Sequence, residues 1–170
     1  LSENYYTTST CSGRISIIRK PGNNAAVKKG GDFLMNEHGF VELAHLKTVI
    51  DDFTIRDDQT GDCLWLKFEP FIMHIQCCDL QAAQSLVKES LKAGCRNSGI
   101  TIGKNNRYLV AIRSTSSMEV PLRCGEAFEP LGKDYLEFLC NQCNLRQVDN
   151  LKRLVMFQEQ IMPLLTGSAT

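Results

Sequence analysis

Hydrophobic and polar residues alternate between residues 63 and 77 in a way that predicts one long strand with a break near its middle. Up to Phe68 every second residue is apolar, as in a half-buried strand, and after Pro70 the apolar residues take the other parity. Since proline cannot donate to a ladder, one extra residue at this point would restore a single phase. We therefore predict a bulge or sharp bend at Glu69–Phe71, with Phe68 and Phe71 both in the core. The predicted core face is Leu64, Leu66, Phe68, Phe71, Met73 and Ile75, opposite Lys67, Glu69, His74 and Gln76.

A helix is predicted directly after this strand, where the pattern changes to helical periodicity. Asp79 suits the N-cap and Gly94 the C-cap. The polar loop Arg96–Gly99 then leads into another strand. Its sequence fits an ordinary turn, and it also fits a place where backbone N–H groups approach a ligand. The apolar stripe of the helix is predicted to be Leu80, Ala83, Leu86, Val87 and Leu91.

The rest of the chain adds short strands and two more helices. Strands are predicted at residues 15–20, 33–38, 99–103, 107–114 and 118–123, with a hairpin turn at Lys104-Asn105-Asn106. A helix at residues 41–52 would bury Leu43, Leu46, Val49 and Ile50. A long helix at residues 132–162, which Pro163 should stop, has its apolar positions at Tyr135, Leu136, Leu139, Leu145, Val148, Leu151 and Val155.

This order of elements predicts an α+β fold. We expect a single domain over residues 1–170, with a mixed β-sheet, packed helices and a long C-terminal helix. Residues 21–31 are interpreted as a flexible connection and residues 54–62 as an acidic loop.

Charge is unevenly distributed, although the net charge of the 170 residues is zero. Residues 1–31 carry five basic groups and one acidic group, and residues 88–123 carry seven and two. A polyanion would bind these two blocks if the fold brings them together, whereas most charge runs are solvated surface. No apolar run approaches the roughly 18 residues of a membrane span, so we expect no membrane association.

The eight cysteines predict a reducing compartment. Several lie within apolar strand or helix patterns, where a free cysteine behaves as a small hydrophobic residue. Cys140 and Cys143 form a CxxC pair in a helical stretch, with no second pair at zinc-finger spacing. We therefore predict that all eight cysteines are reduced, that no metal is bound, and that the protein is cytoplasmic.

Common catalytic signatures are missing from the sequence. It has no GxGxxG, Walker loop, GxSxG or HExxH pattern, which argues against the usual nucleotide-binding and hydrolase folds. Arg14 and Arg113 would suit a carboxylate or phosphate, and Glu69 beside Pro70 is the carboxylate best placed for a functional role. The alternative interpretation of Glu69 is a structural ion pair with Lys67 or an arginine.

Four stretches resemble one family in the same order along the chain. Residues 5–15 (YYTTSTCSGRI) resemble the opening motif of the wybutosine-synthesising tRNA methyltransferases, the third enzyme of that pathway. Residues 67–70 (KFEP), 96–101 (RNSGIT), and 113–122 from RST to EVPL resemble its later motifs. His38 resembles the histidine that ends the second strand in that family. Members usually have a further helical segment before the first motif, so we expect this chain to start inside the domain.

The resemblance implies a reaction and a set of site residues. Such enzymes are expected to move a methyl group from S-adenosylmethionine to a ring nitrogen of the wyosine-type base beside the anticodon of phenylalanine tRNA, with a fold that is not the usual Rossmann type. Glu69 or His38 would accept the proton that the ring nitrogen loses. The residues expected to bind the donor are Ser12, Gly13, Arg14, Asn97, Ser98, Gly99, Arg113 and Glu119.

These residues are expected to meet in one cleft with a positive rim. The cleft would be lined by Ser12, Arg14, His38, Glu69, Ser98, Arg113 and Glu119. Two other classes of protein stay open, namely a non-catalytic RNA-binding module and a regulatory or scaffold domain. Binding of S-adenosylmethionine separates an enzyme from both.

Overall fold

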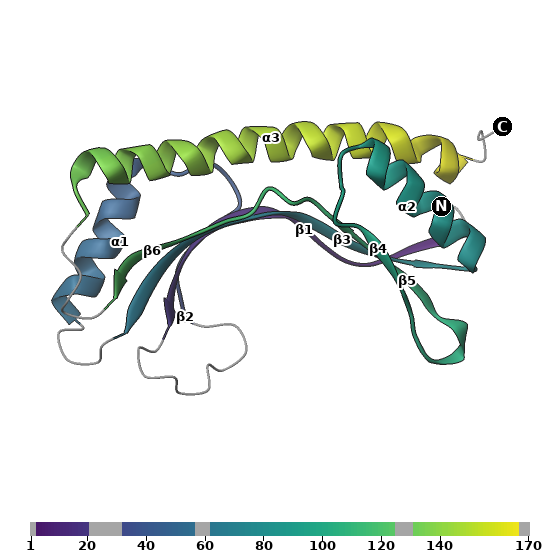
Figure 1. Ribbon diagram of the computed structural model, residues 1–170, viewed down its shortest axis with the longest axis horizontal. Helices are drawn as coiled ribbons and strands as arrows, with labels where there is room; N and C mark the ends of the chain where they lie inside the picture. The colour runs from purple at the N-terminus through teal and green to yellow at the C-terminus, as the bar shows by residue number, and fades with distance from the viewer. Residues whose placement is uncertain (1–2, 21–31, 57–61, 125–130, 167–170) are drawn as a thin grey trace. The chain divides into compact units, whose positions relative to one another are not determined.

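The described residues form six strands and three α-helices, in the order shown in Figure 1. The structure is a computed structural model that describes residues 3–20, 32–56, 62–124 and 131–166. The strands are β1 (Tyr5–Lys20), β2 (Asp32–Glu37), β3 (Cys63–Cys77), β4 (Gly99–Ile102), β5 (Tyr108–Arg113) and β6 (Met118–Cys124). The helices are α1 (Leu43–Arg56), α2 (Leu80–Lys92), the short 3-10 helix η1 (Lys104–Asn106) and α3 (Lys133–Thr166).

All the strands belong to one sheet with the order β2-β1-β3-β5-β4, in which β6 also pairs with β3. The ladders β1–β2, β3–β5, β3–β6 and β4–β5 are antiparallel. The α+β class and the long C-terminal helix are confirmed. A mixed sheet was expected, whereas these four pairings are antiparallel.

The chain divides into two compact units, and β1, β3 and α3 each contribute to both. Unit 1 comprises Leu1–Gly13, Pro70–Ser116 and Val148–Thr170, and unit 2 comprises Arg14–Glu69 and Ser117–Gln147. The single domain over residues 1–170 stays a prediction.

Unit 1 has its own apolar core, which lies between its strands and two helical segments. Phe71, Ile75, Val110 and Ile112 point from β3 and β5 towards Leu86 of α2 and Phe157 of α3. Figure 1 shows α2 and the C-terminal part of α3 on the same face of β4 and β5. We call the opposite face of these strands the outer face of unit 1.

Unit 2 has a second core of the same construction. Ile15 and Ile17 of β1 and Leu64, Leu66 and Phe68 of β3 pack against α1 and the first part of α3. Burial of Leu46, with Leu43, Val49 and Ile50 packed against this core, confirms the predicted inner face of α1. The strand face on the other side is called the outer face of unit 2.

The predicted change in β3, from buried even-numbered residues before Pro70 to buried odd-numbered residues after it, is confirmed. Phe68 and Phe71 are 0% and 1% exposed, whereas Glu69 and Pro70 between them are partly exposed. β3 pairs with β6 up to Phe68 and with β5 from Ile72, so residues 69–71 lie in neither ladder. The backbone N–H of Phe71 donates instead to the side chain of Asn150, at 2.7 Å.

Helix α2 has the predicted N-cap, but its C-cap is Ala93 in place of the predicted Gly94, and two residues of its predicted apolar stripe are exposed. Asp79 accepts a hydrogen bond from the Ala82 N–H at 2.7 Å, and Gly94 follows the Ala93 C-cap with a φ of +81°. Ala83 and Leu86 are buried, whereas Leu80 and Leu91 are 40% and 46% exposed. A helix of 13 residues turns these two terminal positions away from its contact with the strands.

Helix α3 corrects two expectations. It continues to Thr166 through Pro163, which in the last turn removes only one backbone hydrogen bond. The predicted apolar positions at Tyr135, Leu145, Val148, Leu151 and Val155 are exposed; only Leu136 and Leu139 of that set are buried. The inner face uses small and amide side chains in their place, namely Cys140, Cys143, Gln147 and Asn150, together with Phe157.

The remaining predicted elements agree with the structure. β1 is one continuous strand from Tyr5, longer than the predicted residues 15–20, and α1 runs on to Arg56. The hairpin β4–β5 turns at η1, where Asn105 and Asn106 have positive φ. The predicted flexible connection at 21–31 and most of the acidic loop, residues 57–61, lie outside the described residues.

Candidate functional site

Arg14 and Glu69, two predicted site residues, form an ion pair within unit 2. The Nε–H of Arg14 donates to Oε2 of Glu69 at 2.5 Å, and the side chains are 32% and 44% exposed. The guanidinium also lies 5.0 Å from the centre of the Phe33 ring. The expected alternative for Glu69, an ion pair with an arginine, is therefore present, and a partly exposed pair of this kind adds little stability.

Glu119, a third predicted site residue, lies between two lysines on β1 and β3. Its Oε1 is 2.5 Å from Nζ of Lys20 and 3.0 Å from Nζ of Lys67, the residue opposite it in the β3–β6 ladder. The hydrogen bond from Lys20 lowers the pKa of Glu119, with a further contribution from Lys67. Lys20 also lies 4.1 Å from the centre of the Trp65 ring.

These groups share the outer face of unit 2 because of strand alternation. Trp65, Lys67 and Glu69 alternate with the buried Leu64, Leu66 and Phe68. The same face therefore presents cations, carboxylates and two aromatic rings. This composition suits a ligand that carries an ammonium, a carboxylate and a flat ring.

Ser16 adds a buried polar group to unit 2. Its alternation with Ile15 and Ile17 of the core places its side chain on the outer face, with that of Arg14. The residue is 0% exposed, and its Oγ has no hydrogen-bond partner in the described part of the chain. A buried hydroxyl without a partner is costly, so a ligand group that bonds to it would be stabilised.

His38 lies beyond the end of β2, close to its predicted place at the strand end. Its side chain is exposed, and its backbone carbonyl accepts a hydrogen bond from Nε2 of the buried Gln147 at 2.9 Å. The amides of α3 thus hold the backbone here, while the imidazole stays accessible.

In unit 1 the predicted residues of the Arg96–Gly99 loop are tied to the end of β5. Ser98 Oγ donates to the Cys95 carbonyl at 2.7 Å and accepts from the Arg113 N–H at 3.1 Å. The Asn97 N–H donates to the Arg113 carbonyl at 3.2 Å. The hydroxyl of Ser98 thus closes the loop, and the exposed Arg113 guanidinium bonds to none of the described residues.

Ser12 and Gly13 end the unit 1 part of β1. The Ser12 carbonyl accepts a hydrogen bond from Nδ2 of Asn150 at 2.7 Å. Gly13 has a φ of +100°, which favours glycine over residues with a Cβ atom. The positive φ at this position therefore explains why the opening motif has a glycine there.

The predicted site residues divide between the units. Arg14, His38, Glu69 and Glu119 belong to unit 2, whereas Ser12, Gly13, Asn97, Ser98, Gly99 and Arg113 belong to unit 1. Arg14 with Glu69, and Ser98 with Arg113, are in direct contact. A common cleft for all of them stays a prediction.

Four residues with well-defined contacts are absent from the predicted site. Ser9 Oγ lies 2.9 Å from Nδ1 of His74 in unit 1, and in unit 2 Lys20 contacts both Glu119 and the Trp65 ring. The polar side of β3 carried the signal for His74 and Trp65, because it contains an imidazole and an indole on a half-exposed strand. The partner on β1 needed the strand register, which a sequence pattern does not supply.

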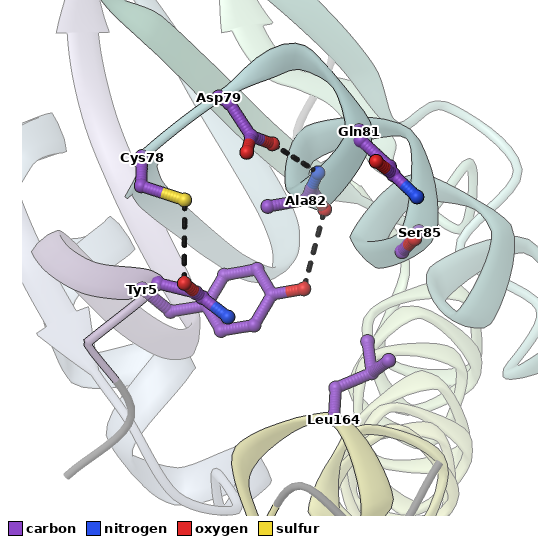
Figure 2. Close-up of a pocket in the computed structure, with 8 residues that line it drawn as sticks. Tyr5, Cys78, Asp79, Gln81, Ala82, Ser85 and Leu164 are labelled. Carbon is purple, nitrogen blue, oxygen red and sulfur yellow. Dashed lines mark hydrogen bonds between the residues drawn. The ribbon is translucent and has the colours of Figure 1, made fainter. Parts of the chain in front are cut away.

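A cavity of about 300 Å³ lies in unit 1. Figure 2 shows it between the start of β1, the first turns of α2 and Leu164 of α3. The Tyr5 hydroxyl donates to the Ala82 carbonyl at 3.3 Å, and the Cys78 thiol donates to Oδ1 of Asn4 at 3.4 Å. Burial raises the pKa of Tyr5. None of the predicted site residues lines this cavity.

The eight cysteines are all free thiols. Burial raises the pKa of Cys143 to about 12 and those of Cys77 and Cys95 to about 11. Within the described ranges, no group of three or more His, Cys, Asp or Glu side chains is arranged to hold a metal ion. The same ranges contain no helix that is both long and apolar enough to cross a membrane.

Solved structures share this fold. The PH1069 protein of Pyrococcus horikoshii has a TM-score of 0.80 and 28% identity, and the match covers 94% of this chain and 78% of that one. A hypothetical protein from Aeropyrum pernix has a TM-score of 0.73 and 25% identity, over 93% of this chain and 88% of that one.

Sequence relatives carry a common name. Proteins of Xenopus laevis and Homo sapiens named tRNA wybutosine-synthesizing protein 3 homolog are 38% and 35% identical to this chain over 91% and 92% of its length. The chain spans 59% and 58% of their lengths, less than two thirds. The sequence model of the family described as Methyltransferase TYW3 matches residues 1–163. The resemblance noted in the sequence is confirmed, and the chain belongs to the TYW3 methyltransferase family.

Proposed function

We propose that this chain is the catalytic part of an S-adenosylmethionine-dependent tRNA methyltransferase of wybutosine biosynthesis. The observation that carries the proposal is the family match over residues 1–163 of 170. The relatives' name, tRNA wybutosine-synthesizing protein 3 homolog, supports the pathway. The substrate would be the wyosine-type base beside the anticodon of phenylalanine tRNA, and the compartment the cytoplasm.

The outer face of unit 2 fits the methyl donor in its chemistry. The amino-acid end of S-adenosylmethionine carries a carboxylate and an ammonium, which match Arg14 and Glu119, and the adenine ring matches the Trp65 or Phe33 ring. The partnerless buried hydroxyl of Ser16 supports a ligand here. Bound S-adenosylmethionine would supply the methyl group as an electrophile.

The chain's own residues would orient the donor and move one proton. Methyl transfer requires the donor carbon and the acceptor nitrogen in line, so a site fixed by strands supplies much of the rate. Glu69 or His38 would accept the proton of the ring nitrogen. Glu69 is paired with Arg14 and partly exposed, and His38 is exposed beyond the end of β2.

The unit 1 residues of the family motifs are proposed as donor-binding residues on the resemblance alone. They are Ser12, Gly13, Asn97, Ser98, Gly99 and Arg113. Within this set, Arg113 offers the charge, since its guanidinium has no partner among the described residues. Ser98 shapes the loop through its two hydrogen bonds.

Two measurements on the whole chain test the proposal. Isothermal calorimetry with S-adenosylmethionine should show binding at one site, and transfer of a radiolabelled methyl group to tRNA isolated from a strain that accumulates the unmethylated wyosine precursor should follow. Glu69→Gln and His38→Gln should each be assayed for transfer with donor binding measured in parallel. Lys88→Ala, on the exposed side of α2, is the control.

Absence of donor binding with retained tRNA binding would favour the second class, a non-catalytic RNA-binding module. Loss of both would leave a scaffold domain. Donor binding without methyl transfer would indicate that this length of chain, shorter than its relatives, needs further residues for activity.

A further inference from the structure

The outer face of unit 1 is uncovered in the described part of this unit. Residues that face each other across an antiparallel ladder share one face of the sheet. Met73, Ile75, Val110 and Ile112 point to the core, so Ile72, His74, Ala111 and Arg113 point to the opposite side. Both helical segments of unit 1 lie on the core side, as Figure 1 shows.

The strand and loop segments that build this face are basic in composition. The segments that build it, residues 4–13, 70–78 and 95–116, contain four basic residues and no aspartate or glutamate. The basic residues are Arg96, Lys104, Arg107 and Arg113. The acidic residues of α2 and α3 in this unit belong to the helices on the other side. A surface that carries only positive charge attracts a polyanion.

A row of small residues runs across the middle of the face and ends at an imidazole. Gly99 lies opposite Ala111, and Ala111 lies opposite His74. A Cβ atom at Gly99 would meet nothing within 4 Å, so the row is open above its backbone. Such a shallow, flat floor beside an aromatic side chain accepts a planar ring.

The imidazole of His74 is held in place from β1. Ser9 Oγ lies 2.9 Å from Nδ1, and Thr8 Oγ1 donates to the His74 carbonyl at 3.0 Å. Nε2 of His74 bonds to none of the described residues. The contact at Nδ1 fixes the ring orientation and leaves Nε2 for an external partner.

Two cations flank the row at the hairpin end. Arg107 Nε donates to Oε1 of Gln76 at 2.8 Å, which holds the arginine over the strand that carries His74. Lys104 is exposed at the tip of the hairpin and has no ion pair with a described residue. A nucleotide base on the row would thus have phosphate-binding groups beside it.

We propose that the outer face of unit 1 binds single-stranded RNA, with a base over the Gly99–Ala111 row against His74 and phosphates at Arg107 and Lys104. The proposal rests on the proposed function, because it assigns the RNA substrate a surface. Unpaired nucleotides fit better than a duplex, since a flat sheet face reads exposed base planes whereas a duplex hides them.

The test measures binding of two fluorescein-labelled RNAs, a single-stranded oligouridine and a duplex of equal length, to the whole chain by anisotropy at several salt concentrations. We expect tighter binding of the single strand. Arg107→Ala with Lys104→Ala should weaken it about tenfold and reduce the salt slope by about one to two units. Lys88→Ala with Lys152→Ala removes the same charge from α2 and α3 and should change neither.

His74 is tested separately from charge. His74→Ala should weaken oligouridine binding several-fold with an unchanged salt slope, and His74→Phe should restore it, because a base stacks on either ring. Ser9→Ala should have a smaller effect in the same direction. Circular dichroism and the melting temperature of each variant show that the fold is intact.

The outcomes separate this proposal from the proposed function. Equal loss in the helix variants and the hairpin variants, or equal affinity for the duplex and the single strand, would overturn the RNA surface. So would equally strong binding of polyglutamate, which would indicate a site for acidic protein segments. Absence of S-adenosylmethionine binding would instead refute the methyltransferase, and the hairpin variants should keep donor binding in either case.

Discussion

The side chain of Asn150 accepts a hydrogen bond from the backbone N–H of Phe71 at 2.7 Å, immediately after Pro70 has removed a donor from β3. Its amide nitrogen donates to the Ser12 carbonyl at 2.7 Å. One buried amide of α3 therefore satisfies a backbone group in the first family motif and another in the residue that follows the second motif. The break in β3 is stable because a helix side chain replaces the missing strand partner.

Asn150→Leu should destabilise unit 1 strongly. The substitution removes both hydrogen bonds and leaves the N–H of the buried Phe71 without this partner, and a buried donor of this kind costs about 1–3 kcal/mol. We expect a loss of about 3 kcal/mol in the free energy of unfolding, measured by urea denaturation. Asn150→Asp keeps the acceptor for Phe71 and should lose less. A leucine variant as stable as the parent would show that water replaces both bonds.

The inner face of α3 is the part of the fold that the sequence pattern did not predict. Strands β3, β5 and β6 could be predicted because their apolar alternation is strong, and the parity change located the break at Pro70, whereas the first part of β1 was not predicted as a strand. The inner face of α3 could not be predicted from apolar periodicity, because it is built from Cys143, Gln147 and Asn150. Gln147 and Asn150 bond to the backbone of His38, Ser12 and Phe71, so polar side chains are buried on this face. The hydrophobic stripe pointed to the opposite face.

The site was predicted unevenly for a related reason. Arg14 and Glu69 belong to two family motifs whose residues were predicted to share one site, and these two side chains are in contact. The contact of Ser9 with His74, and the lysines around Glu119, depend on which residues face each other across the β1–β3 and β3–β6 ladders. Register is set by turns and core packing, which no single strand pattern contains.

Glu119 should make the stability of unit 2 depend on pH in the acid range. Its hydrogen bond from Lys20 lowers its pKa from the ordinary value of 4.5. The ion pairs therefore contribute at neutral pH, and the contribution is lost as pH falls through the lowered pKa. Because the carboxylate is partly exposed, we expect Glu119→Gln to cost less than about 1 kcal/mol at pH 7.

The measurement is thermal unfolding of the parent and Glu119→Gln between pH 7 and pH 3. The difference between the two proteins should shrink as the pH falls and vanish at the acid end. A difference that is constant over this range would show that the two lysines do not stabilise the ionised carboxylate. High salt at pH 7 should also reduce it, since the pairs are screened.

Thiol reactivity should rank the cysteines by burial. Burial raises the pKa of Cys143 to about 12 and that of Cys95 to about 11, so at pH 8 only about one in a thousand Cys95 thiols is ionised. Cys78 is exposed and should be alkylated first. We expect iodoacetamide with peptide mass spectrometry to label Cys78 within minutes and the buried thiols only after denaturation. Early labelling of Cys143 would indicate that α3 opens readily from the core.

Arg14→Lys should separate the shape of the guanidinium from its charge. In the structure the Arg14 Nε–H donates to Oε2 of Glu69, and a guanidinium can bind two carboxylates in one plane because its donors form a rigid fork. Lysine keeps the positive charge but has a single ammonium, so it can hold Glu69 or the ligand well, but not both in one plane. We therefore expect Arg14→Lys to bind S-adenosylmethionine about tenfold more weakly, and Arg14→Ala more weakly still, with little change in the melting temperature because the pair is partly exposed.

Glu69→Gln removes the competing carboxylate and should leave donor binding intact while methyl transfer slows. Calorimetry on the three variants gives the ranking, and equal donor affinity in Arg14→Lys, Arg14→Ala and the parent would remove Arg14 from the donor site.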